Sequence, residues 1–261
     1  MNFRAHFGFM IKISAVIITY NEEKNIGRCI DSLQGLADEI IVLDSYSVDD
    51  TKKICEQKGV TFFQGSFEGH IQQKNIAVSR ATYDFILALD ADEYLSPELK
   101  NSILKVKSSG THQAYSMNRL SSLKGRWIYV TDWYPDKKIR LWNRKNGKWG
   151  GYNPHDKVII NRGTRIKNLQ GNILHVAYDG TEALFKKAYT YAVIYAREKQ
   201  NKVRSSTFKI AYKTTFTFFR NYILKLGFTY GYDGLVISFS IAAYTFFKYS
   251  MLKEFNSGGK K

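Results

Sequence analysis

The first hundred residues alternate short apolar runs with helix-like segments, and this alternation limits the possible folds more than any other feature. The apolar runs are rich in β-branched residues, which is typical of buried parallel strands; they cover residues 13–20, 39–44, 60–64 and 84–90. Helices are predicted between them, and Ser96 and Pro97 are the cap and first residue of a further one; the predicted ranges are 24–36, 49–58 and 70–80. This order predicts an α/β fold with a parallel sheet covered by helices.

Three of the predicted strands end in polar or acidic residues, at the sheet edge where such folds bind ligands. These ends are Thr19-Tyr20-Asn21-Glu22-Glu23, Asp44-Ser45 and Asp90-Ala91-Asp92-Glu93. In an extended chain Asp90 and Asp92 would point the same way, and their like charges would repel unless a cation lay between them. Carboxylates suit Mg²⁺ or Mn²⁺, which also bind phosphate oxygens. The pattern therefore favours a site for a divalent cation and a nucleotide.

These motifs together resemble glycosyltransferase family 2, the inverting enzymes with a GT-A fold. The matching segments are Ile17 to Glu23, Val42 to Ser45, Asp90 to Glu93, Arg140-Leu141-Trp142 and Pro154-His155-Asp156, followed by an aromatic C-terminal segment. The resemblance covers about residues 12–252, and it is strongest to bacterial lipopolysaccharide core β-glucosyltransferases. It implies a Rossmann-like, mostly parallel sheet with flanking helices. It also implies metal-dependent, inverting transfer of a hexose, glucose foremost, from a UDP-sugar to a hydroxyl of a lipid-linked glycan such as the lipopolysaccharide inner core.

The resemblance also assigns a donor-binding set. Its members are Thr19, Tyr20, Asn21, Glu22, Asp44, Ser45, Lys74, Asp90 and Ala91. Four of these assignments have plainer alternatives: Asn21 and Glu22 could cap the helix that follows, Asp44 could be an ordinary turn acid, and Lys74 could be a solvated helix charge.

The general base is expected at Asp156, where related enzymes usually show His-Glu and this chain shows His-Asp. A base is needed because inverting transfer takes a proton from the acceptor hydroxyl as that hydroxyl attacks the sugar. Asp132 and Asp136 are rivals for this role. The alternative for Asp156 is a loop carboxylate paired with Lys157 or Arg162.

Four further residues are expected at the metal or the acceptor. The resemblance places Asp92 and His175 on the metal, although a lone histidine at a strand end is often a core residue. It places Arg140 and Trp142 against the acceptor or the pyrophosphate. A salt-bridged arginine and a core tryptophan are equally good interpretations of that pair.

The rest of the chain predicts an irregular β-rich part over residues 114–176, a helix over 181–199 and two apolar segments over 207–228 and 233–252. Residues 197–261 hold twelve Lys or Arg against three Asp or Glu, so most of the net charge of +16 lies there. Aromatic, basic helices favour a peripheral position on the inner face of the cytoplasmic membrane. A soluble helical hairpin and a transmembrane pair remain alternatives.

The expected domains are an extension over residues 1–11, a catalytic domain over 12–200, a membrane-associating segment over 201–255 and a tail over 256–261. No nucleic-acid motif is present, so no nucleic-acid partner is expected. Cys29 and Cys55 are isolated thiols, which do not make a disulfide framework. Two other functions stay open: a polyprenyl-phosphate sugar synthase of the same fold, and a non-catalytic basic membrane scaffold.

Overall fold

A computed structural model describes residues 10–152 and 155–257 of the chain, the side chain of His155 excepted. The described chain forms two compact units. The first runs to residue 119 and includes residues 137–175, whereas the second comprises residues 120–136 and the chain from residue 176 onward. The boundary that the sequence suggested near residue 200 falls inside the second unit.

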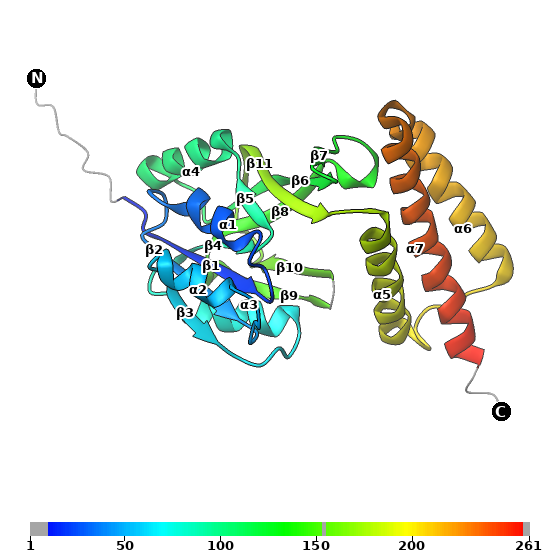
Figure 1. Cartoon of the computed structure of the whole chain (residues 1–261), viewed down its shortest axis with the longest axis horizontal. Coiled ribbons are helices and arrows are strands. Elements are labelled where there is room, and N and C mark those ends of the chain that lie inside the picture. The colour runs from blue at the N-terminus through cyan, green and yellow to red at the C-terminus, as the bar shows by residue number, and fades with distance from the viewer. Residues whose placement is uncertain (1–9, 153–154, 258–261) are drawn as a thin grey trace, which may run out of the picture. The chain divides into compact units, whose positions relative to one another are not determined.

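The first unit begins with the predicted alternation of strands and helices (Figure 1). Its elements are β1 (Ile13–Thr19), α1 (Ile26–Leu33), β2 (Glu39–Asp44), α2 (Thr51–Gln57), β3 (Thr61–Gln64), α3 (His70–Ser79), β4 (Phe85–Asp90), β5 (Glu93–Leu95) and α4 (Pro97–Ser109). Strands β3, β2, β1 and β4 lie side by side and pair in parallel. Ser96 caps α4 by accepting a hydrogen bond from the backbone of Leu99, as the sequence predicts.

Strand β1 is largely apolar because both of its faces are buried, and its two polar residues, Ser14 and Thr19, are buried as well. Ile13, Ala15 and Ile17 belong to the core that includes residues of α1 and α4. Val16 points into a second core, which contains Ala77 of α3. Helices on both faces of a parallel sheet leave no polar face, so the strand cannot show the alternation of a half-exposed strand.

The later strands turn the parallel sheet into a mixed one. They are β6 (Ala114–Leu123), β7 (Arg126–Trp127), β8 (Asp136–Asn143), β9 (Gly147–Tyr152), β10 (His155–Ile160) and β11 (Ile166–Tyr178). The sheet order is β3-β2-β1-β4-β8-β6-β11-β5, with β7 on β6, and β8 runs antiparallel to β4. Strands β9 and β10 form a separate antiparallel ribbon. The expected β-rich part is thus confirmed, and the parallel half of the sheet is its first four strands.

The second unit is built on three helices that pack side by side: α5 (Thr181–Lys199), α6 (Thr207–Phe219) and α7 (Gly231–Ser257) (Figure 1). A π-helical turn (Arg220–Leu224) and a 3-10 turn (Gly227–Tyr230) connect α6 to α7. The first turn of α7 needs a glycine at 234, because a Cβ there would lie 1.8 Å from the carbonyl oxygen of Gly227. Among the described residues, the segment 227–257 is the one long and apolar enough to cross a membrane.

Candidate functional site

The loops that follow β1 and β2 are locked together by hydrogen bonds from side chains to backbone. Asn21 Oδ1 accepts from the backbone N–H of Val48 at 2.9 Å, and the backbone N–H of Asn21 donates to Ser47 Oγ at 2.8 Å. The backbone N–H of Glu22 donates to Thr51 Oγ1 at 2.8 Å. These bonds hold two polar strand ends at one edge of the sheet, as the sequence predicts. Tyr20 is exposed beside them.

Asp44 is fully buried and organises the second of these loops. Its carboxylate accepts from the backbone N–H of Ser47 at 2.9 Å and from Gln64 Nε2 at 3.1 Å. Ser45 is tied to the same place, because its Oγ accepts from Gln73 Nε2 at 3.1 Å and its backbone N–H donates to the carbonyl of Thr19. Asp44 therefore shapes the turn after β2, and its expected contact with the donor stays a prediction.

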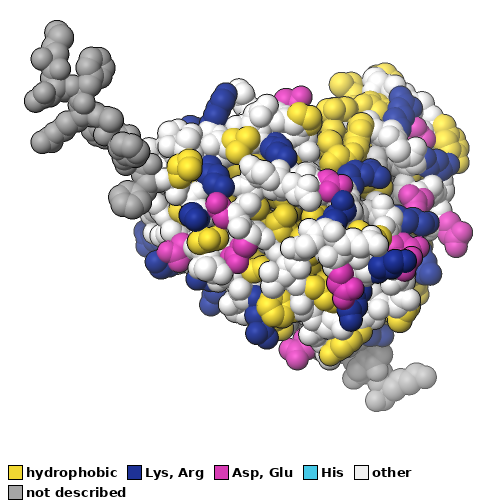
Figure 2. Space-filling view, turned by 60° about the vertical axis from the view of Figure 1, so that its left-hand side comes forward, with side chains coloured by type: hydrophobic (Ala, Val, Ile, Leu, Met, Phe, Trp, Pro, Cys, Tyr) yellow, Lys and Arg dark blue, Asp and Glu magenta, His cyan; other side chains and the backbone are white. Residues whose placement is uncertain are grey.

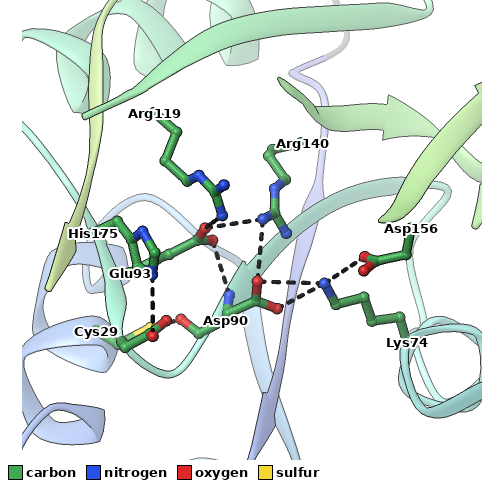
Figure 3. A network of polar contacts seen from close by, with 9 residues as sticks. Cys29, Lys74, Asp90, Glu93, Arg119, Arg140, Asp156 and His175 are labelled. Atoms are coloured by element: carbon green, nitrogen blue, oxygen red, sulfur yellow. Dashed lines mark hydrogen bonds and ion pairs between the residues drawn. The ribbon is translucent and has the colours of Figure 1, made fainter. Parts of the chain in front are cut away.

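Asp90, the last residue of β4, lies between two cations (Figure 3). Lys74 Nζ is 2.9 Å from Asp90 Oδ1, and Arg140 Nη2 is 3.2 Å from Asp90 Oδ2. Burial alone would raise the pKa of Asp90, but the charges of Lys74 and Arg140 outweigh it and hold that pKa well below its usual range. The carboxylate is therefore ionised at neutral pH and fixed in place. Lys74 is buried rather than a solvated helix charge, and its role in donor binding stays a prediction.

Asp156 of β10 belongs to the same chain of contacts. Its Oδ2 lies 2.8 Å from Lys74 Nζ, so one lysine joins the end of β4 to the β9–β10 ribbon. The pairing of Asp156 with Lys74 replaces the partners Lys157 and Arg162 that the sequence offered. Residues 153 and 154, which precede His155 in the motif, lie outside the described part of the chain. The rivals Asp132 and Asp136 belong to the second unit.

Glu93, which the sequence indicated only as part of an acidic run, lies at the centre of these contacts. It is fully buried, and its Oε1 accepts from Arg140 at 2.9 Å and from Arg119 at 3.3 Å. Its Oε2 accepts from the backbone N–H of Asp90 at 3.0 Å. Glu93 thus holds the guanidinium that pairs with Asp90 and also the backbone at the end of β4. Arg119, in the middle of β6, carried no signal in the sequence.

Two tryptophans form the wall behind these cations. Lys74 Nζ lies 4.5 Å from the centre of the Trp149 ring, and the Arg140 guanidinium carbon lies 5.3 Å from it, at distances typical of cation–π contacts. Trp142 is fully buried, meets Trp149 edge to face, and donates its indole N–H to the carbonyl of Gly147. Trp142 thus takes the core position, and Arg140 takes the salt-bridged position, that the sequence gave as alternatives.

Asp90 and Asp92 are joined by a turn, and the expectation of an extended chain is wrong at this point. Residues 91 and 92 form a turn, with Ala91 buried. The turn sends Asp92 toward His175 of β11, whose Nε2 lies 3.2 Å from Asp92 Oδ2. Strand pairing sets this contact, since His175 is the partner of Glu93 between β11 and β5.

The Asp92–His175 pair fits the donor set of a divalent cation that takes its other ligands from phosphate and water. An imidazole nitrogen and a carboxylate oxygen are accepted by Mn²⁺, and two adjacent protein ligands leave room for a nucleotide. No group of three or more His, Cys, Asp or Glu side chains that could hold a metal is found in the described chain. A closed, all-protein metal cage is therefore not formed by these residues.

The comparison with known proteins decides the family. The model of the family described as "Glycosyl transferase family 2" matches residues 14–171. This range holds all but the first residue of β1 and the elements from α1 to β10, together with Asp90 and its ion-pair partners Lys74 and Arg140. The chain belongs to glycosyl transferase family 2. It is a transferase with a GT-A-like α/β fold, in which a curled, mixed sheet is flanked by helices.

Similar proteins cover almost the whole chain. An "Uncharacterized glycosyltransferase" of Rickettsia felis is 33% identical over 260 residues, which span 94% of this chain and 90% of that protein. The lipopolysaccharide core biosynthesis glycosyltransferase LpsC of Rhizobium meliloti is 23% identical, with 90% of each chain covered. The crystal structure of S. aureus TarS 1–349 in complex with UDP is 15% identical, has a TM-score of 0.46, and covers 95% of this chain and 92% of that one.

Proposed function

We propose that this transferase moves a sugar, glucose foremost, from a UDP-sugar to a hydroxyl of a lipid-linked glycan such as the lipopolysaccharide inner core, with inversion at the anomeric carbon. One observation carries the proposal. Lys74 lies within 3 Å of both Asp90 at the end of β4 and Asp156 on the β9–β10 ribbon. A donor-binding carboxylate and a candidate base thus meet at a single buried cation.

The donor would lie against the locked loops that follow β1 and β2. In this proposal the nucleoside is surrounded by Thr19, Tyr20, Asn21, Glu22 and Ser45. Asp44 holds the loop after β2 in place through its hydrogen bonds. Ala91 and Asp90 lie on the path to the diphosphate. The cations Lys74 and Arg140 suit the negative charge of that diphosphate, and low solvent access strengthens their attraction to it.

Asp92 and His175 would hold the divalent cation, Mn²⁺ or Mg²⁺. When bound, the cation supplies positive charge that neutralises a departing nucleoside diphosphate. The protein's own share of this work is positional, because the turn at residues 91–92 and the β5–β11 pairing bring the two ligands within 3.2 Å.

Asp156 would take the proton from the acceptor hydroxyl as its oxygen attacks the anomeric carbon and the bond to the diphosphate breaks. A single displacement of this kind inverts the configuration and needs one base. Lys74 pairs with Asp156 before the donor arrives. Competition from the donor's phosphates for Lys74 would leave the carboxylate available to the acceptor.

The acceptor and the location in the proposal rest on two further observations. The printed name of LpsC supports a lipopolysaccharide core acceptor, and the apolar segment 227–257 supports a membrane-associated enzyme. We infer a peripheral position on the inner face of the cytoplasmic membrane, where a UDP-sugar and a lipid-linked acceptor can meet.

The test is turnover of a panel of UDP-sugars with lipid-linked acceptors in detergent, with Mn²⁺ or Mg²⁺ present. We expect UDP release to depend on acceptor, and NMR to show that the new glycosidic bond has the opposite anomeric configuration to the donor. Retained configuration, or release of a sugar phosphate rather than UDP, would contradict the proposed reaction.

A further inference from the structure

Helix α6 buries none of its residues and carries a ladder of exposed aromatic rings. Phe208, Tyr212 and Phe216 are spaced four residues apart, so they share one face of the helix. They are 79%, 52% and 45% exposed. Their rings are nearly parallel, with neighbouring centres 6.3 Å and 6.0 Å apart. An exposed apolar surface of this extent marks an interaction site.

The chain after α6 extends this surface into an apolar turn at residues 223–228. Leu224 is 71% exposed and Leu226 is 52% exposed. Leu226 has a φ of 57°, in the left-handed region where a bulky residue is strained and glycine would fit more easily. A leucine held there, facing solvent, has no structural advantage over glycine. An exposed leucine in this conformation therefore indicates that the turn binds an apolar partner.

Ion pairs hold this turn in place. Asp132 pairs with Arg220 and with Lys225, whose Nζ lies 2.6 Å from Asp132 Oδ1. Asn221 is fully buried and accepts from the backbone N–H of Asp132 at 2.7 Å. The π-helical turn is thus fixed at both ends, so Leu224 is displayed by an ordered segment.

The charge around this surface selects the partner. Residues 207–232 contain four Lys or Arg and no Asp or Glu. Lys209 and Lys213 make no ion pair with an acid within the described residues, and they lie over the rings of Tyr249 and Tyr212. Figure 2 shows one face of the molecule, on which hydrophobic side chains gather toward the upper right with Lys and Arg side chains beside them. Exposed aromatic rings with uncompensated cations match an anionic lipid surface.

The packing of the helices argues that the chain rests on the lipid rather than crossing it. Helix α7 contacts α5 through Phe185–Phe239 and Tyr189–Phe247, and it buries Ser238, Ser240 and Thr245 within the second unit. Helix α6 has 13 residues and rises about 20 Å, which is short of a hydrocarbon core of about 30 Å. We propose that α6 and the turn 223–228 form a docking surface that inserts into the interface of an anionic membrane. This inference deepens the proposed function by naming the lipid-binding surface.

The test is co-sedimentation of the full chain with vesicles of phosphatidylcholine, with and without phosphatidylglycerol. We compare wild type with the double variant Phe208→Ser and Leu224→Ser.

The matched control is Ile159→Ser with Ile166→Ser, two residues of the first unit that are both 47% exposed. We expect the partition coefficient to fall at least roughly tenfold in the double variant and to stay unchanged in the control. In the variant Lys209→Gln with Lys213→Gln, we expect the partition coefficient to fall about fivefold for each charge removed, and only on the vesicles that contain phosphatidylglycerol.

Three outcomes would overturn this inference: no vesicle binding by folded wild type, equal losses in variant and control, or a surface covered by a second copy. The last would show in light scattering as a wild-type dimer that the double variant dissociates. UDP binding is measured on the same preparations to separate the two proposals. Vesicle binding without UDP binding would support the docking surface and contradict the proposed function. UDP binding without vesicle binding would contradict the docking surface alone.

Discussion

The two units place their charged and apolar side chains in opposite ways. The first unit buries charge: Lys74, Arg140 and Glu93 are each at most 6% exposed, and they form ion pairs around Asp90. The second unit exposes apolar rings and leucines on α6 and on the turn 223–228. A soluble protein under no functional constraint would do neither, because burying charge is costly and large exposed apolar patches favour association.

The contrast teaches where to look for function in a chain of this kind. Burying these charges costs free energy that folding must offset. The same charged groups can bind a polar ligand that competes for their ion pairs. The exposed apolar side chains favour a partner that removes them from water. The proposed donor site thus rests on buried charge in the first unit, and the proposed docking surface on exposed apolar side chains in the second.

The largest effect is expected for Asp156→Asn. Losing a general base lowers kcat by about 10²–10⁴-fold for a hydroxyl acceptor, because the attacking oxygen must then lose its proton to water. Binding of UDP should persist, since the substitution keeps the size of the side chain. Turnover assays and UDP titrations on the same protein measure the two quantities. A full-rate variant would instead favour a phosphate acceptor, which needs no base.

The substitution Glu93→Ala tests how much the buried ion pairs of the first unit contribute to stability. The change leaves Arg119 and Arg140 without a buried partner, and breaking such pairs costs about 3–5 kcal/mol of unfolding free energy. Thermal or denaturant unfolding measures it. Asp84→Asn is the control, because Asp84 pairs at the surface with Lys145 at 2.5 Å and exposed pairs contribute about 1 kcal/mol or less. Similar losses in both variants would mean that burial does not set the strength of the Glu93 pairs.

A smaller effect, in the second unit, is expected for Asp132→Asn. Burial would raise the pKa of Asp132, but hydrogen bonds from Lys225, Asn221 and Arg220 outweigh it and lower that pKa. A carboxyl group whose pKa is lowered by folding stabilises the folded protein at pH values above its unfolded pKa of about 3.9. This stabilisation is lost as the pH falls through the folded pKa. The variant should therefore be about 1–3 kcal/mol less stable at pH 7, and this difference should shrink below about pH 4. Unfolding curves across that range check it; a difference that did not depend on pH would contradict the ionic account.

The sequence predicted the elements of the first unit well because their signals are local. Apolar β-branched runs marked β1, β2 and β4, and Ser96 with Pro97 marked the start of α4. The helix predicted over residues 181–199 matches the bounds of α5. Patterns of this kind depend on neighbours in the chain, so no tertiary information is needed to interpret them.

Features that depend on distant partners were harder to predict. The turn at residues 91–92 brings Asp92 to His175, which pairs with Glu93 between β11 and β5 some 80 residues later in the chain. The partnership of Arg119 with Glu93 has no local signature at all. The π-helical turn after α6 is held by Asp132, almost 90 residues earlier. The sequence could indicate which residues carry chemistry, but not which of them face one another.

The most direct test of the central claim is calorimetric titration of UDP, with and without Mn²⁺, into wild type and into Asp92→Asn. The proposed donor site predicts that wild type binds UDP more tightly with Mn²⁺, and that Asp92→Asn loses the metal-dependent part while it remains folded. Folded wild type that binds no UDP in detergent with Mn²⁺ would contradict the donor site. Metal-dependent binding that survives in Asp92→Asn would contradict the assignment of the cation to Asp92 and His175.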